Sequence, residues 1–581
     1  MEEQLRTQLP VLKEVVERRI LAKDIPQPEK KPLAKQATLF DNNNDNLDNK
    51  DNNDNPLPPP NHILIEGDNL HALTALTFTH EGQIDVMYFD PPYNTGNKDF
   101  KYNDSFVDRE DSYRHSKWLS FMDKRLRIAK RLLSEKGVVF ISIDDNEQAQ
   151  LKLLCDEIFG ELNFVANINW QKVYSPRMDA KGFSTETENI VCYSKSVEYK
   201  PNKISLKQEN KQFKFFDTNY NQFYRRRSWR KEGSGSNRSD RPNLFYPISI
   251  PNGNEIFPIK PDGIEGRWRG NMEYFLNLQT QNLVEFCKDK SGTWQIYIKQ
   301  FLEEDAQRPP TTLWLNDEVG HTHEASEEIK SIFGSTVFAT PKPLRLLKKI
   351  FSIGGFQSAN ILDFFAGSGT TLHATMQLNA EDGGNRQCIL VTNNENNIAE
   401  DVCYERNRRV IQGYTNSKGE WVPGLTNNNL RYYKSEFVGR EPILKNKREL
   451  TRLATELLCI KEDCYEEQKL EYKNIRYFSQ NFKRLLVIYD DDAIETAVEL
   501  IRSIVAVGEI AENSIKVYVF SPGQYPFTEE FEEVLPWIKL SALPDAIYKA
   551  YMNILPGKNP GYKVPELTDE NDSQAVLFEE D

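Results

Sequence analysis

The chain has 581 residues, 28% of them charged, 39% hydrophobic and 11% aromatic, and its formal net charge is -14. At about 150 residues per domain, this length predicts three or four structural units and a large core. Seven cysteines are scattered along the chain without a Cys-x-x-Cys pair, which excludes a disulfide scaffold and disfavours structural zinc. We therefore expect reduced thiols and no metal site.

The N-terminal part of the chain predicts neither a targeting signal nor a membrane segment. Its start is acidic, and no apolar run approaches the roughly 20 residues that cross a bilayer, so we expect a cytoplasmic protein. Residues 1–25 predict one amphipathic helix, which is either a docking or dimerisation element or an ordinary core helix. The apolar positions near helical spacing are Leu9, Leu12, Val15, Val16 and Ile20. Residues 26–60 are rich in Asn, Asp and Pro and predict a disordered linker.

Strands and helices alternate on both sides of a long middle segment. Residues 62–68 and 84–90 are predicted strands that end on acidic residues, and a helix near 118–133 and a buried strand at 138–143 follow. The same order of strand, glycine turn and helix returns at 360–372, with a further strand at 388–392. This repetition predicts an α/β protein with a doubly wound, Rossmann-like sheet.

The composition divides the chain further. Residues 61–164 and 336–435 are predicted to form two halves of one domain, separated by an insertion at 165–335 that is rich in Asn, Gly, Pro and aromatic residues. Residues 440–581 predict a small separate α/β domain with helices near 449–458 and 494–505 and strands near 485–489 and 515–520. This last domain carries no catalytic signature and ends in an acidic tail at 561–581.

The first chemical motif is Asp90-Pro91-Pro92-Tyr93, at the end of a predicted strand. Two prolines fix the backbone and leave carbonyl groups free to accept hydrogen bonds. The Asp90 carboxylate and the Pro91 carbonyl could each take one N–H of an exocyclic amine such as adenine N6, directing its lone pair at an electrophile. Tyr93 offers a ring for stacking, whereas an ordinary capped turn would explain only the Asp-Pro pair.

The second motif is a glycine turn, between a strand and a helix, whose backbone N–H groups could face an anion. It comprises Asp363, Phe365, Gly367, Ser368, Gly369, Thr370 and Thr371. A dinucleotide site would need a third glycine where position 372 is Leu, so NAD is disfavoured. A glycine turn combined with an acceptor loop for an amine instead favours S-adenosylmethionine (AdoMet) as the cofactor.

Individual roles in holding AdoMet follow from its functional groups. Thr370 and Thr371 could cap the helix and meet the carboxylate, and Asp363 could take the amine. Glu395, after the next strand, is the candidate for the ribose hydroxyls. Asp68 could reach the adenine or the methionine moiety, or could instead cap the helix that begins at Asn69.

With both motifs in place, the chain resembles the β-class amino-methyltransferases of DNA, in which Asp-Pro-Pro-Tyr precedes the AdoMet motif. Further matches resemble the modification (Mod) subunits of type III restriction-modification systems. These matches are Ile65-Glu66-Gly67-Asp68-Asn69-Leu70, Tyr93-Asn94-Thr95-Gly96, Ile143-Asp144-Asp145-Asn146-Glu147, Tyr246-Pro247-Ile248, Glu265-Gly266-Arg267-Trp268-Arg269 and Thr340-Pro341-Lys342-Pro343. The resemblance covers about residues 60–415 and implies an adenine-N6 methyltransferase.

The resemblance also implies that residues 338–343, including Phe338, Thr340 and Lys342, lie over the cofactor. It implies target recognition between the two blocks, a homodimer and a restriction helicase-nuclease as a partner. The family often has His where this chain has the segment beginning at Glu188, so we assign no catalytic role there. Asp90 before Pro-Pro-Tyr favours adenine N6, and cytosine N4 is the alternative base. A subunit that mainly delivers the helicase-nuclease, with methylation secondary, is the alternative function.

The middle segment is locally basic although the whole chain is acidic. Residues 201–270 contain fourteen basic side chains against seven acidic ones. Affinity for nucleic acid follows local phosphate contacts, so a mobile basic loop here could hold duplex DNA while the target base is extruded; a solvated charge cluster is the alternative. The candidate DNA contacts are Arg225, Arg226, Arg227, Trp229, Arg230, Lys231, Arg267 and Arg269.

Overall fold

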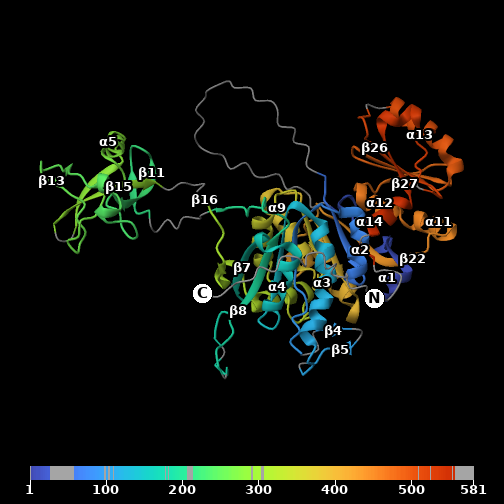
Figure 1. Cartoon of the computed structure of the whole chain (residues 1–581), viewed down its shortest axis with the longest axis horizontal. Helices are drawn as coiled ribbons and strands as arrows, with labels where there is room; N and C mark the ends of the chain where they lie inside the picture. Colours follow the sequence, from blue (N-terminus) through green and yellow to red (C-terminus); the bar gives the residue numbers. More distant parts are fainter. Residues whose placement is uncertain are drawn as a thin grey trace, which may run out of the picture. The chain divides into compact units, whose positions relative to one another are not determined.

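The computed structural model describes residues 2–26, 58–96, 100–102, 105–108, 110–176, 178–180, 182–205, 213–289, 292–301, 307–507, 510–523, 525–552 and 554–555. Most of the expected linker and the whole acidic tail lie outside these residues. The chain divides into two compact units (Figure 1). The first comprises Met1–Asn202 and Thr311–Asp581, and the second comprises Lys203–Pro310.

A ten-stranded sheet forms the centre of the first unit, in the order β1-β22-β2-β19-β18-β3-β6-β8-β7-β17. The bounds, in that order, are Gln8–Glu14, Asn429–Gly439, Asn61–Glu66, Gln387–Thr392, Asn360–Asp363, Ile84–Phe89, Leu133–Ile143, Thr187–Ser194, Phe164–Gln171 and Leu313–Trp314. The six strands from β22 to β6 run parallel, and β1 and β8 are antiparallel to their neighbours. The expected doubly wound α/β sheet is confirmed.

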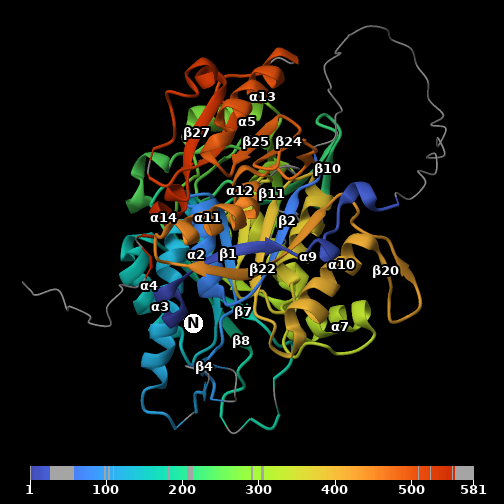
Figure 2. The ribbon, with the colours of Figure 1, turned by 90° about the vertical axis from the view of Figure 1, so that its right-hand side faces the viewer.

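Helices cover both faces of this sheet, which is why its central strands are continuous apolar runs. On one face, α2 (Asn69–His80), α3 (Arg114–Leu132) and α4 (Gln148–Phe159) share a buried core with the strands. On the other face lie α8 (Leu344–Gly354), α9 (Thr370–Asp382) and α10 (Glu405–Gln412). Figure 2 shows α2 and α3 on the opposite side of the sheet from α9 and α10. Among the described residues, no helix combines the length and apolarity that a bilayer crossing requires.

The neighbouring strands β3 and β18 set the geometry of the site. Their register pairs Ile361 with Val86 and Leu362 with Met87 in a parallel ladder. Continuing that register by three residues brings Phe365 level with Asp90. The two motifs, 273 residues apart in sequence, therefore follow adjacent strands at the same carboxyl edge of the sheet.

The N-terminus differs from the single helix expected for residues 1–25. A short α1 (Glu2–Thr7) leads into the strand β1, and two 3₁₀ turns follow at Val16–Arg18 and Ala22–Asp24. β1 pairs antiparallel with β22 along its whole length. Pro10 lacks an N–H and would break a long helix, but an edge strand tolerates it. The element thus docks on the chain's own sheet.

The C-terminal part forms a five-stranded sheet in the order β23-β24-β25-β26-β27. The strands are Glu467–Gln468, Ile475–Gln480, Lys483–Ile488, Ile515–Phe520 and Ile538–Leu543, and the helices α11 to α14 are Leu444–Leu453, Thr455–Glu462, Ile494–Val507 and Asp545–Tyr551. We expected a separate domain, but α12 and α14 pack on α2. Leu458 and Tyr551 join the core of the large sheet, and the Tyr551 hydroxyl donates to the Pro10 carbonyl.

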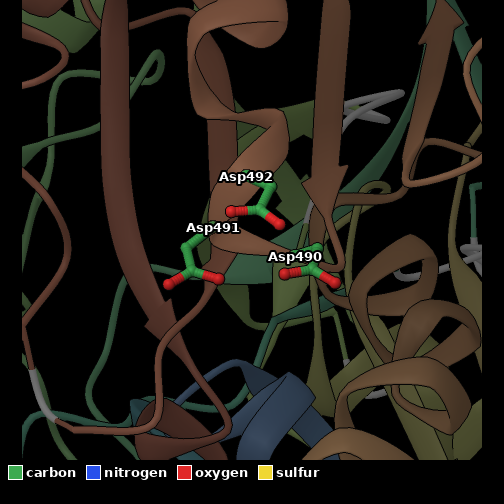
Figure 3. Close-up of side chains that lie close together, drawn as sticks. All are labelled: Asp490, Asp491 and Asp492. Atoms are coloured by element: carbon green, nitrogen blue, oxygen red, sulfur yellow. The ribbon is translucent and has the colours of Figure 1, made fainter.

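Three consecutive aspartates, Asp490, Asp491 and Asp492, lie at the start of the turn that precedes α13 (Figure 3). One oxygen of each lies within 4.8 Å of the others, and Asp491 and Asp492 are exposed. Exposed carboxylates at a helix start complement the positive end of the helix dipole without any ion. We therefore assign no metal to this group.

The second unit is smaller than the insertion expected at 165–335. Residues 165–202 and 311–335 belong to the first unit, because β7, β8 and β17 extend the large sheet, followed by α6 (Asn316–Val319) and α7 (Thr322–Phe333). The compact part contains β10 (Phe215–Asp217), β11 (Gln222–Ser228), β15 (Trp294–Phe301) and β14 (Val284–Lys288) in one sheet, with α5 (Met272–Thr280). Four further pairs of two-residue strands occur along the chain: β4/β5 (Lys101–Tyr102, Ser105–Phe106), β9/β16 (Ile204–Ser205, Gln307–Arg308), β12/β13 (Ile248–Ser249, Glu255–Ile256) and β20/β21 (Tyr414–Thr415, Trp421–Val422).

Candidate active site

The Asp90 loop and the glycine turn form one site at the carboxyl edge of the sheet. The rings of Phe89 and Phe364, at the ends of β3 and β18, lie 4.3 Å apart between centroids. Tyr93 and Phe365 both pack against the same core. The structure thus brings together the two segments that sequence analysis expects to meet.

The loop after β3 is held rigidly. The indole N–H of Trp118, which is fully buried in α3, donates to the Pro92 carbonyl at 2.7 Å. Within the loop, Pro91 is buried, and Asp90 and Tyr93 are half-buried. Because the prolines fix the backbone and Trp118 anchors it, the Asp90 carboxylate has a defined direction.

Asp90 belongs to a polar cluster that we call the carboxylate cluster, formed by Asp90, Tyr93, Glu188 and Lys342. The Lys342 ammonium lies 2.6 Å from the Asp90 carboxylate, 3.0 Å from the Tyr93 hydroxyl and 3.2 Å from Glu188. The Tyr93 hydroxyl lies 2.5 Å from Asp90 and 2.6 Å from Glu188. Lys342 belongs to the segment expected to lie over the cofactor, and it contacts Asp90, the proposed acceptor of the amine's N–H.

Glu188 is the residue of this cluster to which sequence analysis assigns no role. It is the second residue of β8, which is antiparallel to β6, so the start of β8 lies at the edge where the parallel strands end. Its side chain is nearly buried, and its second oxygen lies 3.3 Å from the Lys172 ammonium. The available signal was a carboxylate two residues before the apolar run Ile190-Val191-Cys192-Tyr193.

The pKa values of the two carboxyl groups in the cluster are shifted in opposite directions. Burial raises the pKa of the Asp90 carboxyl above its usual range, although Lys342 opposes this shift. Burial also acts on Glu188, but the ammonium groups of Lys342 and Lys172 outweigh it and hold the pKa of Glu188 below its usual range. A proton in this cluster therefore resides more readily on Asp90 than on Glu188.

The glycine turn makes a close approach that only glycine allows. Gly367 has φ +49°, and a Cβ placed there would lie 3.0 Å from the Phe338 ring. Gly369 has φ +73° and precedes α9. The ring of Phe338 therefore lies against the turn, which places the 338–343 segment beside both motifs, while Thr340 within it is exposed.

The hydroxyls after the turn bond inward instead of capping α9. Thr371 donates to the Asp363 carboxylate at 2.6 Å, and the Phe365 amide donates to the same group at 2.9 Å. The buried guanidinium of Arg406 donates to Thr370 at 2.6 Å and to Ser368 at 3.3 Å. The expectation that both threonines cap the helix is wrong, because the Thr371 hydroxyl bonds to Asp363 and the Thr370 hydroxyl bonds to Arg406.

The other predicted cofactor residues lie near the same edge. Asp68 accepts the Leu70 amide at 2.9 Å, so it caps α2, and its carboxylate lies 3.5 Å from Arg125. Capping was the alternative reading of this residue. Glu395 follows β19 at the start of a 3₁₀ turn and is exposed. Contacts of Asp68 and Glu395 with a cofactor stay predictions.

The predicted DNA-contacting residues fall in the second unit, where two expectations are wrong. Arg225, Arg226 and Arg227 lie on the paired strand β11 and not in a mobile loop. Trp229 has no exposed surface and packs in a core with Trp268, Phe275 and Ile296, so it cannot stack on a base. The mixture of arginine and tryptophan in the sequence is typical of a nucleic-acid-binding surface. In the structure, however, the Trp229 indole is part of the core of the second unit.

Several of these arginines bind the unit's own groups. The Arg226 guanidinium pairs with Glu285 at 2.6 Å. Arg225 donates to the Gln300 side chain at 3.0 Å. Three others donate to backbone carbonyls: Arg230 to Ile259, Arg267 to Gly235 and Arg269 to Ser228. Arg227 is exposed, and Lys231 is half-buried. These contacts occupy N–H donors of the guanidinium groups, and Glu285 offsets the charge of Arg226, so fewer donors are available to DNA phosphates than the sequence count suggests.

Known proteins are similar to this chain over the region that contains the site. The family described as DNA methylase matches residues 84–411, which include both motifs. The Type II methyltransferase M.KpnI of Klebsiella pneumoniae is 34% identical over 403 residues, covering 67% of this chain and 94% of that protein. The StyLTI Mod subunit of Salmonella typhimurium is 37% identical over 355 residues, covering 57% of this chain and 52% of that subunit.

The solved structure of the PvuII DNA methyltransferase, described as cytosine-N4-specific, covers 60% of this chain and 90% of its own at 11% identity, with a TM-score of 0.32. The chain spans about half the length of the type III Mod subunits that it matches.

The fold and the site define an α/β protein in which the Asp90 loop lies beside a glycine turn at the carboxyl edge of the parallel strands in one sheet. The chain belongs to the DNA methylase family. This membership confirms the expected function, that of an AdoMet-dependent DNA methyltransferase.

Proposed function

We propose that the chain transfers the methyl group of AdoMet to adenine N6 in specific double-stranded DNA. The observation that carries the proposal is the position of the Asp90 carboxylate, anchored by the Pro92–Trp118 bond, one strand away from the glycine turn at Asp363. Asp90 and the Pro91 carbonyl orient the amine, and Tyr93 offers its ring to the base. The methylated nucleoside released from treated DNA, identified by mass spectrometry, tests the proposal.

The residues present fit the donor. AdoMet, when bound, supplies an electrophilic methyl group on a positively charged sulfur. The Asp363 carboxyl lies at the carboxyl edge of the sheet, one strand away from the Asp90 loop, where its ionised form favours a cationic ligand. Phe365 and Phe338 offer apolar surface at the turn, and Gly367 leaves the turn backbone accessible.

The base is proposed as adenine because an aspartate opens the acceptor loop. Cytosine N4 is the alternative base. The matched family is described as DNA methylase, and this description does not distinguish the two amines. N6-methyladenine as the sole product supports the proposal, whereas N4-methylcytosine overturns the choice of base. Since the substrate is cellular DNA, we propose that the enzyme acts in the cytoplasm.

We further propose that the chain is the modification and recognition subunit of a restriction-modification system. Relatives named as type III Mod subunits, at 37% and 32% identity, support this role. In that setting the chain would form a homodimer and associate with a restriction helicase-nuclease. Copurification of such a nuclease with the tagged chain supports the assignment, and delivery of that nuclease with no methylation would favour the alternative function.

We expect AdoMet affinity to depend on pH through Asp363. Burial raises the pKa of Asp363 to about 7, so the group must lose a proton before it pairs with the cofactor's amine. Because the folded-state pKa is raised, affinity is present above about pH 7 and falls nearly tenfold per unit as the pH drops below it. Calorimetric titration of AdoMet from about pH 5.5 to 8 measures the slope.

Asp363→Asn is the matched control for this experiment, since it keeps an acceptor for Thr371 but cannot ionise. It should bind AdoMet more weakly, with an affinity that hardly changes with pH. A wild-type affinity that is constant with pH, or a slope that persists in Asp363→Asn, would show that this carboxyl does not hold the amine.

We expect Arg227 to contribute one phosphate contact. Arg227→Ala should weaken binding to duplex DNA about 3- to 10-fold and lower the slope of log affinity against log salt by about 1. Fluorescence anisotropy over a salt series measures this. Arg226→Ala is the matched control, because Glu285 already neutralises Arg226 and its removal should change the slope less. An unchanged slope in Arg227→Ala contradicts the contact.

A further inference from the structure

The Tyr93 hydroxyl lies between two carboxyl groups. Its oxygen is 2.5 Å from one oxygen of Asp90 and 2.6 Å from one oxygen of Glu188. Both separations are within the range of strong O–H···O hydrogen bonds. Asp90, Tyr93 and Glu188 thus form a continuous chain of three oxygens.

The protons in this chain can be counted. The Lys342 ammonium has three N–H donors and faces three acceptors, on Asp90, Tyr93 and Glu188. It fills one acceptor position of each oxygen-bearing group and supplies none of the protons in the O···O contacts. A phenol has one proton, but two short O···O contacts need two. One carboxyl must therefore carry the second proton.

The surroundings determine which carboxyl carries it. Burial raises the pKa of Asp90, whereas Lys342 and Lys172 hold the pKa of Glu188 low. The arrangement is then Asp90 donating to the Tyr93 oxygen and Tyr93 donating to the Glu188 carboxylate. In this direction every donor and acceptor of the phenol is used, with Lys342 on its second lone pair.

We propose that Tyr93 and Glu188 form a proton relay that takes the substrate's amino proton from Asp90. This inference rests on the proposed function. The amine nitrogen forms its bond to the methyl carbon as the S–C bond breaks, and the electron pair of that bond stays on sulfur. Before the transfer, Asp90 gives its proton to Tyr93 as Tyr93 gives its own to Glu188, which leaves Asp90 as a carboxylate. The nitrogen then passes one proton to the Asp90 carboxylate, and Glu188 releases its proton to solvent beside Lys172, which restores the starting arrangement.

The relay has an outlet toward solvent. The second oxygen of Glu188 lies 3.3 Å from Lys172, whose side chain is 26% exposed at the end of β7. The charged and titratable groups that face the relay are Lys342, Lys172, Tyr88, Asp144 and Asp363. Glu188 acts through Tyr93 and is therefore a positioning and proton-accepting residue without contact to the base.

The test compares single-turnover methyl transfer by the full chain and its variants between about pH 6 and 9. The substrates are tritium-labelled AdoMet and genomic DNA from a host without DNA methylation. Glu188→Gln should lower the rate roughly 100-fold at neutral pH, with a rate that rises with pH where the wild-type rate is constant. AdoMet affinity should stay within about twofold, since Glu188 does not contact the cofactor. Glu186→Gln, two residues along the chain, is the matched control and should behave as wild type.

Two further variants separate proton transfer from a structural effect. Glu188→Gly should regain at least about tenfold in rate when formate is added, because formate replaces the missing acceptor. Tyr93→Phe keeps the ring but breaks the chain, so it should lose rate without rescue by formate, and it decides the question if Glu188 variants do not fold. The relay is overturned if Glu188→Gln and Tyr93→Phe both transfer methyl groups at rates within threefold of the wild-type rate and with the wild-type pH dependence. A wild-type chain that methylates no adenine instead overturns the proposed function.

Discussion

Asp90→Ala is expected to lower methyl transfer to DNA about 100- to 1000-fold, a loss of roughly 3 to 4 kcal/mol of transition-state stabilisation. The variant removes the carboxylate that orients the amine, while the Pro91 carbonyl and the glycine turn stay in place. AdoMet affinity should change less than about threefold, because the main cofactor contacts lie around Asp363 and Phe338. Tritium transfer to DNA and calorimetric AdoMet binding measure the two quantities.

Asp145→Ala is the matched control, since Asp145 is an exposed carboxylate that follows β6 at the same edge of the sheet. It should transfer methyl groups at the wild-type rate. Asp90→Ala with full activity would mean that another group orients the amine, and equal losses of activity and AdoMet binding would mean that Asp90 acts by holding the cofactor.

Lys342→Met is expected to have the second large effect, on stability. It leaves the half-buried Asp90 and the buried Glu188 beside each other without their common cation. Breaking a buried pair in this way costs about 3 to 5 kcal/mol of the free energy of unfolding. The loss should be largest at neutral and alkaline pH and smaller as the pH falls, because protonation of the carboxyls removes their repulsion. Thermal unfolding at two pH values measures both effects.

Lys348→Met on α8 is the matched control, because Lys348 pairs with Glu381 near the surface and exposed pairs contribute about 0 to 1 kcal/mol. A melting temperature of Lys342→Met equal to that of Lys348→Met at neutral pH would show that the carboxylate cluster does not need this cation.

The meeting of the two motifs at one edge could be predicted because it requires only that both preceding strands run parallel in the same sheet. Apolar runs ending at Asp90 and Asp363 are recognisable as buried parallel strands, and parallel strands share a carboxyl edge. The expected helix near 118–133 follows from buried residues every three or four positions and corresponds to α3. The periodicity gave no information on which strands would be neighbours.

The N-terminal error has a different origin. Leu9, Leu12 and Val16 fit helical spacing, but pairing with β22 decides the conformation of β1, and that partner lies more than 400 residues away. Local spacing cannot report such a contact. Val16, which the helix would bury, is 56% exposed.

Side-chain partners were the least predictable part of the site. Glu188 was not expected because its importance comes from the antiparallel entry of β8, which no local pattern shows. Trp229 was expected outside because its neighbours are arginines, yet alternation along an extended chain sends adjacent side chains to opposite faces. Both outcomes depend on which face of a sheet is covered.

Modified-base sequencing of DNA from cells that express the chain tests the central claim most directly, with Asp90→Ala expressed in parallel. N6-methyladenine should occur at one recurring sequence in cells with the wild-type chain and should be missing at that sequence in cells with the variant. Adenines left unmodified by the wild-type chain, or a modification that persists in full without the Asp90 carboxylate, would contradict the account.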